Sequence, residues 1–140
     1  MTVKEKLVGA KVGDQLFSTT EHIERDAMVR YAGASGDFNT IHYNDAAAKA
    51  AGLPGVIAHG MLTMGIIGSL VENWLGDVAA VKSFTTRFSA MLVVDGTTGA
   101  DLTVSGTLAE LTEDSATIEV SAVSGEGQNI VTNTEVVVAL

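Results

Sequence analysis

The spacing of apolar residues changes between the first and the second half of the chain. After a short extended segment at 16–23, apolar residues recur three or four positions apart from residue 27 to near Gly33 and again in 60–75, which is typical of helices. From Leu102 onward apolar and polar residues alternate, as they do in strands with one buried face. The pattern therefore predicts an α+β protein in which a long helix is followed by consecutive antiparallel strands. The predicted late strands are 102–108, 118–122 and 130–139, with turn formers at 113–114 and 125–129.

The segment 60–75 is apolar on nearly every side, which is the pattern of a helix that neighbours cover all around. Gly65 and Gly68 lie inside it, although each glycine costs a helix about 1 kcal/mol. Close approach of another backbone would explain glycine at these two positions. We therefore expect the later strands to form a sheet that wraps around this helix.

Two shorter features precede the long helix. The run from Ser35 to Thr40 is rich in turn formers and is bounded by apolar residues, so we expect an ordered loop there. Asp45 is placed to cap a short alanine-rich helix that runs through Ala51 and stops at Gly52.

Composition favours a single globular domain spanning 1–140. The chain has 140 residues, of which 46% are hydrophobic, and this is enough to build one core. The formal net charge of −9 opposes binding to the nucleic-acid backbone and to anionic lipid surfaces, so we expect neither as a partner. The absence of cysteine excludes disulfides, thiolate zinc sites and cysteine nucleophiles.

The sequence predicts neither a secretory leader nor a membrane span. Segment 1–11 contains interspersed charges and no apolar run, so a cytoplasmic location is the default expectation. The uncharged stretch 53–71 is interrupted by Pro54, His59 and glycines, and its apolar part, 61–71, is too short to cross a bilayer.

Two motifs in a set order resemble the signature of a known family. Tyr-Ala-Gly-Ala-Ser-Gly-Asp-Phe-Asn-Thr-Ile-His spans 31–42, and Ile-Ala-His-Gly-Met-Leu-Thr spans 57–63. Both resemble segments of the MaoC-like dehydratases, which include the (R)-specific enoyl-CoA hydratases. The likeness also takes in 11–16, 74–77 and the pair 87–88, so it covers most of the chain.

The resemblance implies a hot-dog fold, in which an antiparallel sheet wraps around a long central helix. It makes 31–42 a loop that overhangs the sheet and carries a catalytic Asp and His, and it makes 57–63 the start of the central helix. Within the family, the chain resembles the B subunit of the mycobacterial (3R)-hydroxyacyl-ACP dehydratases. Thr40 departs from the pattern, because the family usually has proline there.

The first motif also suits the hydration of an enoyl thioester on chemical grounds. Adding water needs a base for the water and a proton for the α-carbon, and a carboxylate beside an imidazole can supply both. Asp37 and His42 are therefore the expected acid/base pair, and the resemblance implies that they hold one water between them. Negative charge on the thioester oxygen needs a donor, which we expect to be the backbone N–H of Gly60 at the helix N-terminus.

Four further residues are expected to support this pair or to contact the substrate: Ser35, Asn39, His59 and Met61. Asn39 is expected to fold the loop, and His59 to brace it or to cap the helix. His22 is expected to be a surface residue without a partner. Three histidines scattered in this way, without carboxylates at ligand spacing, predict no metal site, and we expect no cofactor.

The expected reaction is the reversible hydration of trans-2-enoyl thioesters to (3R)-hydroxyacyl thioesters, carried by CoA or by acyl carrier protein in fatty-acid metabolism. One alternative is an acyl thioesterase of the same fold, although such enzymes usually have a carboxylate on the central helix, where only Glu72 is available near the far end. The other alternative is a non-catalytic subunit that binds acyl chains, against which the intact Asp37 and His42 argue.

A single wrapped sheet exposes an edge strand and one side of its helix. Pairing two such sheets covers both, so we expect a homodimer or a heterodimer with a related hot-dog subunit.

Overall fold

The computed structural model describes residues 1–140, and a five-stranded antiparallel sheet forms its centre. The strand order is β1-β3-β4-β5-β2, so β1 and β2 are the two edges. The strands are β1 (Gln15–Ile23), β2 (Val81–Phe88), β3 (Ala100–Leu111), β4 (Ser115–Ser124) and β5 (Val131–Ala139). The alternating pattern predicted β3, β4 and β5, and their inward-facing apolar residues form much of the core.

Strand β2 is the one strand that the hydrophobic pattern did not predict. Its register against β5 shifts between Val81 and Ser83, where the extra residue is in β2, and between Thr85 and Arg87, where it is in β5. The first bulge breaks the two-residue alternation of β2. The large apolar residues of β2 are spaced three and four positions apart, which does not look like a strand in the sequence.

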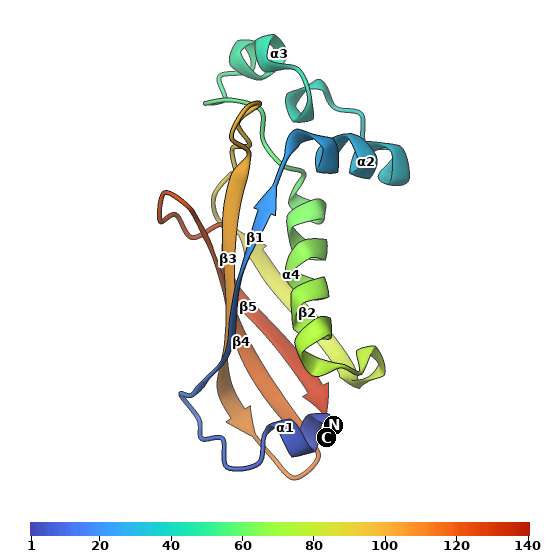
Figure 1. Ribbon diagram of the computed structural model, residues 1–140, viewed down its shortest axis with the longest axis vertical. Coiled ribbons are helices and arrows are strands. Elements are labelled where there is room, and N and C mark those ends of the chain that lie inside the picture. The colour runs from blue at the N-terminus through green and yellow to red at the C-terminus, as the bar shows by residue number, and fades with distance from the viewer.

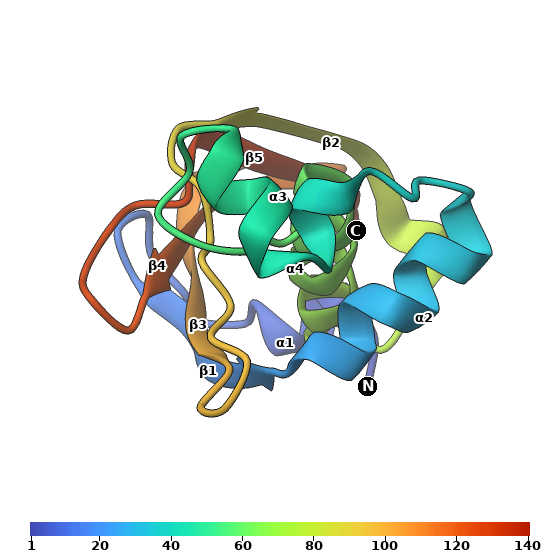
Figure 2. The same ribbon diagram turned by 90° about the horizontal axis from the view of Figure 1, so that it is seen from above.

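Helix α4 (Gly60–Leu75) lies against the concave face of the sheet, and the strands curve around it (Figure 1, Figure 2). Its bounds agree with the predicted helix. Only one stripe of the helix is buried, and it consists of Thr63, Ile67, Val71 and Leu75. The opposite side is exposed along Met61, Gly65, Ser69 and Asn73. The expectation that neighbours cover this helix on every side is therefore wrong for the single chain.

The two glycines inside α4 do not meet another backbone of this chain. A Cβ placed on Gly65 would have no atom within 4 Å, and one on Gly68 would touch only the ring of Phe84, at 3.9 Å. The predicted close approach of a backbone is thus also wrong within the chain. No helix of the structure combines the length and the apolar character needed to cross a bilayer.

Three shorter helices complete the fold: α1 (Val3–Lys6), which was not predicted, α2 (Arg25–Ser35) and α3 (Asp45–Ala50). Helices α2 and α3 stand beyond the end of the sheet, beside the N-terminus of α4 (Figure 1). We call residues 25–50 the overhang. It also contains a 3-10 turn, η1 (Thr40–His42), and a second 3-10 turn, η2 (Val78–Ala80), precedes β2.

The ends of the overhang helices differ slightly from the sequence prediction. Helix α2 runs two residues past Gly33 and ends with Gly36 in a left-handed conformation, φ 76°. Asn44, not Asp45, caps α3, because its side-chain oxygen accepts the N–H of Ala47 at 3.0 Å. Asp45 is instead the first residue of the helix, and its carboxylate is free to bind elsewhere.

Candidate active site

Asp37 and His42 lie together at the end of the sheet where α4 begins. Asp37 is on the exposed loop after α2, and its side chain is 50% exposed, whereas the side chain of His42 is only 9% exposed. Nε2 of His42 is 3.9 Å from Oδ2 of Asp37. This separation is too long for a direct hydrogen bond and short enough for one water or hydroxyl oxygen to contact both groups.

The other nitrogen of His42 determines which tautomer the ring adopts. Nδ1 lies 2.7 Å from the carbonyl oxygen of Ile57. A carbonyl can only accept, so Nδ1 of the neutral ring carries the proton and donates it. Nε2 is then unprotonated and presents its lone pair toward Asp37. The fold thus orients His42 as a proton acceptor at the position facing the carboxylate.

The loop that carries Asp37 is folded by its own short polar side chains. The hydroxyl of Ser35 accepts the N–H of Asp37 at 3.1 Å, and the side-chain oxygen of Asn39 accepts the N–H of Ile41 at 3.2 Å. The backbone N–H of Asn39 donates to Oδ1 of Asp37 at 3.2 Å. One carboxylate oxygen of Asp37 is therefore held by the loop, which leaves Oδ2 to face His42.

His59 lies directly behind the pair, just before α4. It is 2% exposed, and its Nε2–H donates to the carbonyl oxygen of Asp37 at 3.2 Å. The ring of His59 stacks on the ring of His42, with the two centroids 3.8 Å apart. The ring of Tyr31 meets the His59 ring edge-on, with their centroids 4.7 Å apart. Burial lowers the pKa of His59, so the ring is held neutral. The contact braces the loop, and no side-chain hydrogen bond caps the helix.

Gly60 is the first residue of α4, so its N–H has no acceptor within the helix. The first N–H that bonds back is that of Thr63, which donates to the carbonyl of His59 at 3.1 Å. The ring of Phe88 lies where a side chain on Gly60 would go, 3.4 Å from a Cβ placed there. Gly60 thus presents a backbone donor beside an apolar ring, next to His59.

Met61 begins a groove along the exposed side of α4. Met61 is 58% exposed. The groove has a volume of 430 Å³ and follows the helix from Met61 to Asn73, with Tyr31 and Glu21 on its other wall. Tyr31 also touches His59, so the groove starts close to the Asp37 and His42 side chains, although neither lines it.

The ring geometry disfavours a metal ion between these residues. One ligand atom each of Asp37, His42 and His59 lie within 4.8 Å of one another, so these two histidines are not scattered as the sequence suggested. However, the two rings are stacked only 22° from parallel. A histidine binds metal in the plane of its ring, at about 2 Å, and two stacked planes do not meet that close to the rings. We therefore still expect no metal.

His22 lies apart from this cluster, on β1. It is exposed as predicted, but it does have partners: Nδ1 is 2.7 Å from Asp101 on β3, and Nε2 is 3.7 Å from Glu24. The hydrogen bond to Asp101 raises the pKa of His22. Sequence reasoning gave no role in the site to Tyr31 or Phe88, although both lie in segments that resemble the family; the structure brings Tyr31 against His59 and Phe88 against Gly60.

Comparison with known proteins identifies the family. A model of the MaoC like domain matches residues 6–129, so the chain belongs to the MaoC-like dehydratase family. It is 41% identical over 70 residues to 3-hydroxyacyl-thioester dehydratase X of Mycobacterium tuberculosis, covering 50% of this chain and 24% of that protein. It is 40% identical over 65 residues to fatty acid synthase subunit beta of Saccharomyces cerevisiae, covering 45% of this chain and 3% of that protein. The chain therefore spans less than a quarter of either relative.

Solved structures confirm the predicted hot-dog fold. A MaoC-like dehydratase superposes with a TM-score of 0.90 at 36% identity, over 98% of this chain and 41% of that one. The (R)-hydratase from A. caviae involved in PHA biosynthesis superposes with a TM-score of 0.79 at 25% identity. The match covers 93% of this chain and 96% of the hydratase. A chain of the ChsH1-ChsH2 complex from Mycobacterium tuberculosis also superposes with a TM-score of 0.79, over 94% of this chain and 98% of that one. At 22% identity this match shows a shared fold alone.

Proposed function

We propose that the protein catalyses the reversible hydration of trans-2-enoyl thioesters to (3R)-hydroxyacyl thioesters, with Asp37 and His42 as its acid/base pair. The observation that carries the proposal is the 3.9 Å gap between a carboxylate and the unprotonated nitrogen of an oriented imidazole. The names of two similar proteins, a 3-hydroxyacyl-thioester dehydratase and an (R)-hydratase, support the substrate class and the stereochemistry.

In this mechanism one water sits between Oδ2 of Asp37 and Nε2 of His42. The pair takes a proton from the water while the oxygen forms a bond to the β-carbon, and the electrons of the double bond move toward the thioester carbonyl. The same proton is then returned from the pair to the α-carbon, so water is added without any net change in the protonation of the protein. Dehydration follows the same steps in reverse.

The negative charge that develops on the thioester oxygen needs a fixed donor. We assign this role to the N–H of Gly60, because an unpaired N–H at a helix N-terminus combines a hydrogen bond with the favourable helix dipole. The acyl chain would then lie in the groove along α4, which begins at Met61. From there to Asn73 the groove extends about 18 Å at 1.5 Å per helical residue.

The thioesterase alternative has less support from the geometry. It calls for a carboxylate on the central helix near the reacting carbonyl, and Glu72 is the only acid in α4. Glu72 lies twelve residues after Gly60, which is about 18 Å along the helix. The carboxylate that lies near Gly60 is Asp37, whose partner across the gap is an imidazole suited to hydration.

A spectrophotometric assay with short and long trans-2-enoyl thioesters tests the proposal, with CoA and acyl carrier protein as carriers. We expect loss of the enoyl absorbance without release of free thiol. Release of thiol would instead indicate a thioesterase. Absence of any reaction, in the isolated chain and in complexes with co-expressed related subunits, would indicate a non-catalytic acyl-binding subunit.

We also propose that the working form is a dimer, with either a second copy or a related hot-dog chain. Both β1 and β2 are open edges, and large apolar side chains near the candidate site are exposed: Phe38, Tyr43, Met61, Phe88 and Met91. A partner over this surface would complete the substrate pocket. Light scattering alongside activity tests this, and a fully active monomer would contradict it.

The expected cytoplasmic location and the likeness to a B subunit stay predictions.

A further inference from the structure

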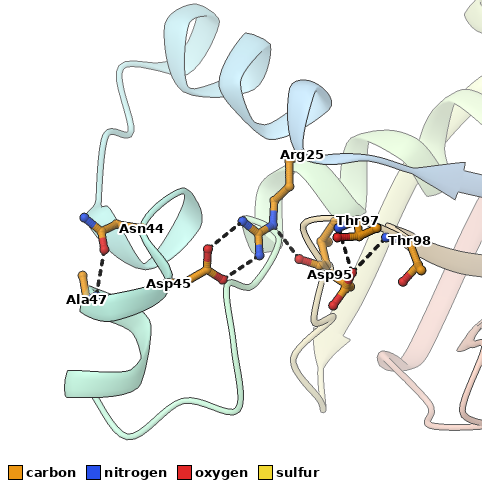
Figure 3. Close-up of polar contacts among 8 residues, drawn as sticks. Arg25, Asn44, Asp45, Ala47, Asp95, Thr97 and Thr98 are labelled. Carbon is orange, nitrogen blue, oxygen red and sulfur yellow. Dashed lines mark hydrogen bonds and ion pairs between the residues drawn. The ribbon is translucent and has the colours of Figure 1, made fainter.

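Arg25, the first residue of α2, has a guanidinium group bound on both sides. Its Nη1 and Nη2 donate to the two carboxylate oxygens of Asp45, at 3.2 and 2.8 Å, and its Nε donates to the carbonyl oxygen of Val94 at 2.6 Å. Figure 3 shows this fork between α3 and the turn that follows Val94. The side chain is only 22% exposed, which is low for an arginine.

The turn beside Arg25 is shaped to receive it. A Cβ on Gly96 would lie 3.6 Å from the guanidinium carbon, so the backbone of the turn lies flat against the group. Asp95 accepts the N–H groups of Thr97 and Thr98, both at 2.8 Å, which fixes the turn (Figure 3). These hydrogen bonds, and the positive charge of Arg25 to a smaller extent, lower the pKa of Asp95.

Val94 belongs to the same short ribbon that orients His42. The N–H of Val94 donates to the carbonyl of Val56 at 2.9 Å, and Ile57 forms a bridge with Val93. Ile57 also supplies the carbonyl that fixes the His42 ring. The guanidinium and the imidazole are therefore both attached to one ribbon, through neighbouring positions of its two strands.

Asp45 closes this set of contacts, because it follows His42 by three residues. Starting from His42, the connections run through the ribbon of Ile57 and Val94 to Arg25, from Arg25 to Asp45, and along the chain back to His42. The hydrogen bond from Arg25 also lowers the pKa of Asp45 and keeps it ionised. At least two other contacts hold this part of the overhang: the N–H of Ile57 donates to the carbonyl of Ile41 at 3.2 Å, and Ala48 is fully buried in the core. Most of the remaining residues from Gly33 to Ala50 are exposed.

We propose that Arg25 is a positioning residue for His42: it anchors the segment 40–45 to the ribbon and so sets the distance between the imidazole and Asp37. This inference depends on the proposed function only for its kinetic readout. An ion pair this exposed on the Asp45 side adds little to global stability. Its contribution to geometry is larger, because displacing a reacting group by about 1 Å can cost about 10²-fold in rate.

The test compares Arg25→Gln with Arg30→Gln. Arg30 lies on the same helix and pairs with Asp26, one turn away, at 2.5 Å, and both side chains are largely exposed. We expect Arg25→Gln to lower kcat about 10- to 100-fold with a smaller change in KM. Arg25→Lys should lower kcat several-fold, because a single ammonium cannot bind both carboxylate oxygens of Asp45 and the carbonyl of Val94 at once. The kcat of Arg30→Gln should stay within twofold of the wild-type value.

A second readout does not need activity. In wild type labelled with ¹⁵N-histidine, NMR should show His42 as a single tautomer with the proton on Nδ1. In Arg25→Gln we expect a mixture of tautomers or faster exchange of that proton, and in Arg30→Gln no change. If wild type lacks hydratase activity, the proposed function fails and these spectra still decide the role of Arg25.

The inference is overturned if folded Arg25→Gln keeps its activity within twofold, or if its His42 spectrum matches wild type. Should Arg25→Gln fail to fold, Asp45→Asn replaces it, because Asp45 is 73% exposed and the amide is similar in shape. Asp45→Asn should lower kcat severalfold and broaden the same His42 signal. An unchanged kcat and an unchanged signal in that variant would overturn the inference equally.

Discussion

The body of the molecule and the overhang are held together by different forces. In the body, α4 packs its stripe of Thr63, Ile67, Val71 and Leu75 onto the sheet, and the core residues around it are almost fully buried. The overhang, residues 25–50, is largely exposed and is tied down by individual polar contacts. These include the fork of Arg25, the bond from His42 to Ile57, the bond from His59 to Asp37 and the backbone bond from Ile57 to Ile41. Of its apolar side chains, Met28 and Ala48 join the core.

This difference suits the proposed chemistry. Apolar packing is strong but non-directional, whereas hydrogen bonds specify distance and angle. A site that must hold one water between a carboxylate and an imidazole requires direction more than strength. Substitutions in the body should therefore change stability with little effect on the chemistry, and substitutions at the overhang contacts should do the opposite.

The largest effect is expected from the pair itself. His42→Ala and Asp37→Asn should each lower kcat/KM about 10²- to 10⁴-fold, the usual contribution of general acid/base steps. Because both act on one water, the double variant should lose little more than the worse single variant. Steady-state kinetics on all four proteins measures this, with circular dichroism to show that each is folded. Fully multiplicative losses would indicate independent roles.

In the body, Ile67→Ala should reduce the free energy of unfolding by about 2–5 kcal/mol, because Ile67 is completely buried and its removal leaves a cavity. Urea titration followed by fluorescence measures the change. Activity per folded molecule should stay close to wild type. A variant that is fully stable but inactive would show that the body and the overhang are not separable in this way.

Gly65→Leu tests whether the acyl chain lies along the exposed side of α4. Space around Gly65 is open, so leucine fits without a clash and projects into the groove. We expect at least about a tenfold loss of kcat/KM for long enoyl chains, because each methylene that a hydrophobic pocket no longer binds costs about 1–3 kcal/mol. For short enoyl chains we expect little loss. Gly65→Ala is the matched control, because it gains helix propensity without filling the groove. Equal losses at all chain lengths would place the chain elsewhere.

The smallest effect concerns the pH dependence that His59 confers. Burial lowers its pKa in the folded state, so the unfolded chain takes up the proton first as pH falls. The stability associated with neutral His59 is thus present above a pH of about 6.5 and is lost below it, by no more than about 1.4 kcal/mol per pH unit. Denaturation of wild type and His59→Gln between pH 7.5 and 5.5 should show a shallower slope in the variant. Identical slopes would contradict this assignment.

Much of the fold could be predicted because its elements are regular. The alternation in β3 and β4, the β-branched residues of β5 and the largely apolar sequence of α4 are local signals of secondary structure. Strand β2 was missed because a bulge near its start breaks the alternation and because it has few apolar residues. The exposure of one side of α4 was missed for a different reason: an apolar sequence does not distinguish a side covered by the same chain from one left open for a substrate or a partner.

The candidate site was predictable only where its residues are close in sequence. Asp37, Asn39 and His42 share one motif, so the sequence indicated them together. Arg25 meets the site through contacts with distant segments, and its own neighbours in the sequence carry no sign of it. Tyr31 belongs to the motif, but its contact with His59 does not follow from the sequence. Such roles follow from the tertiary packing and require the structure.

The central claim is that the overhang pair adds water to an enoyl thioester with one stereochemical outcome. Chiral analysis of the hydration product formed by wild type, with Asp37→Asn run in parallel as a background, tests it most directly. We predict the (3R)-hydroxyacyl thioester from wild type and at least about 10²-fold slower product formation by the variant. Predominance of the (3S) product would contradict the proposed stereochemistry, and equal product from both proteins would contradict the role of Asp37.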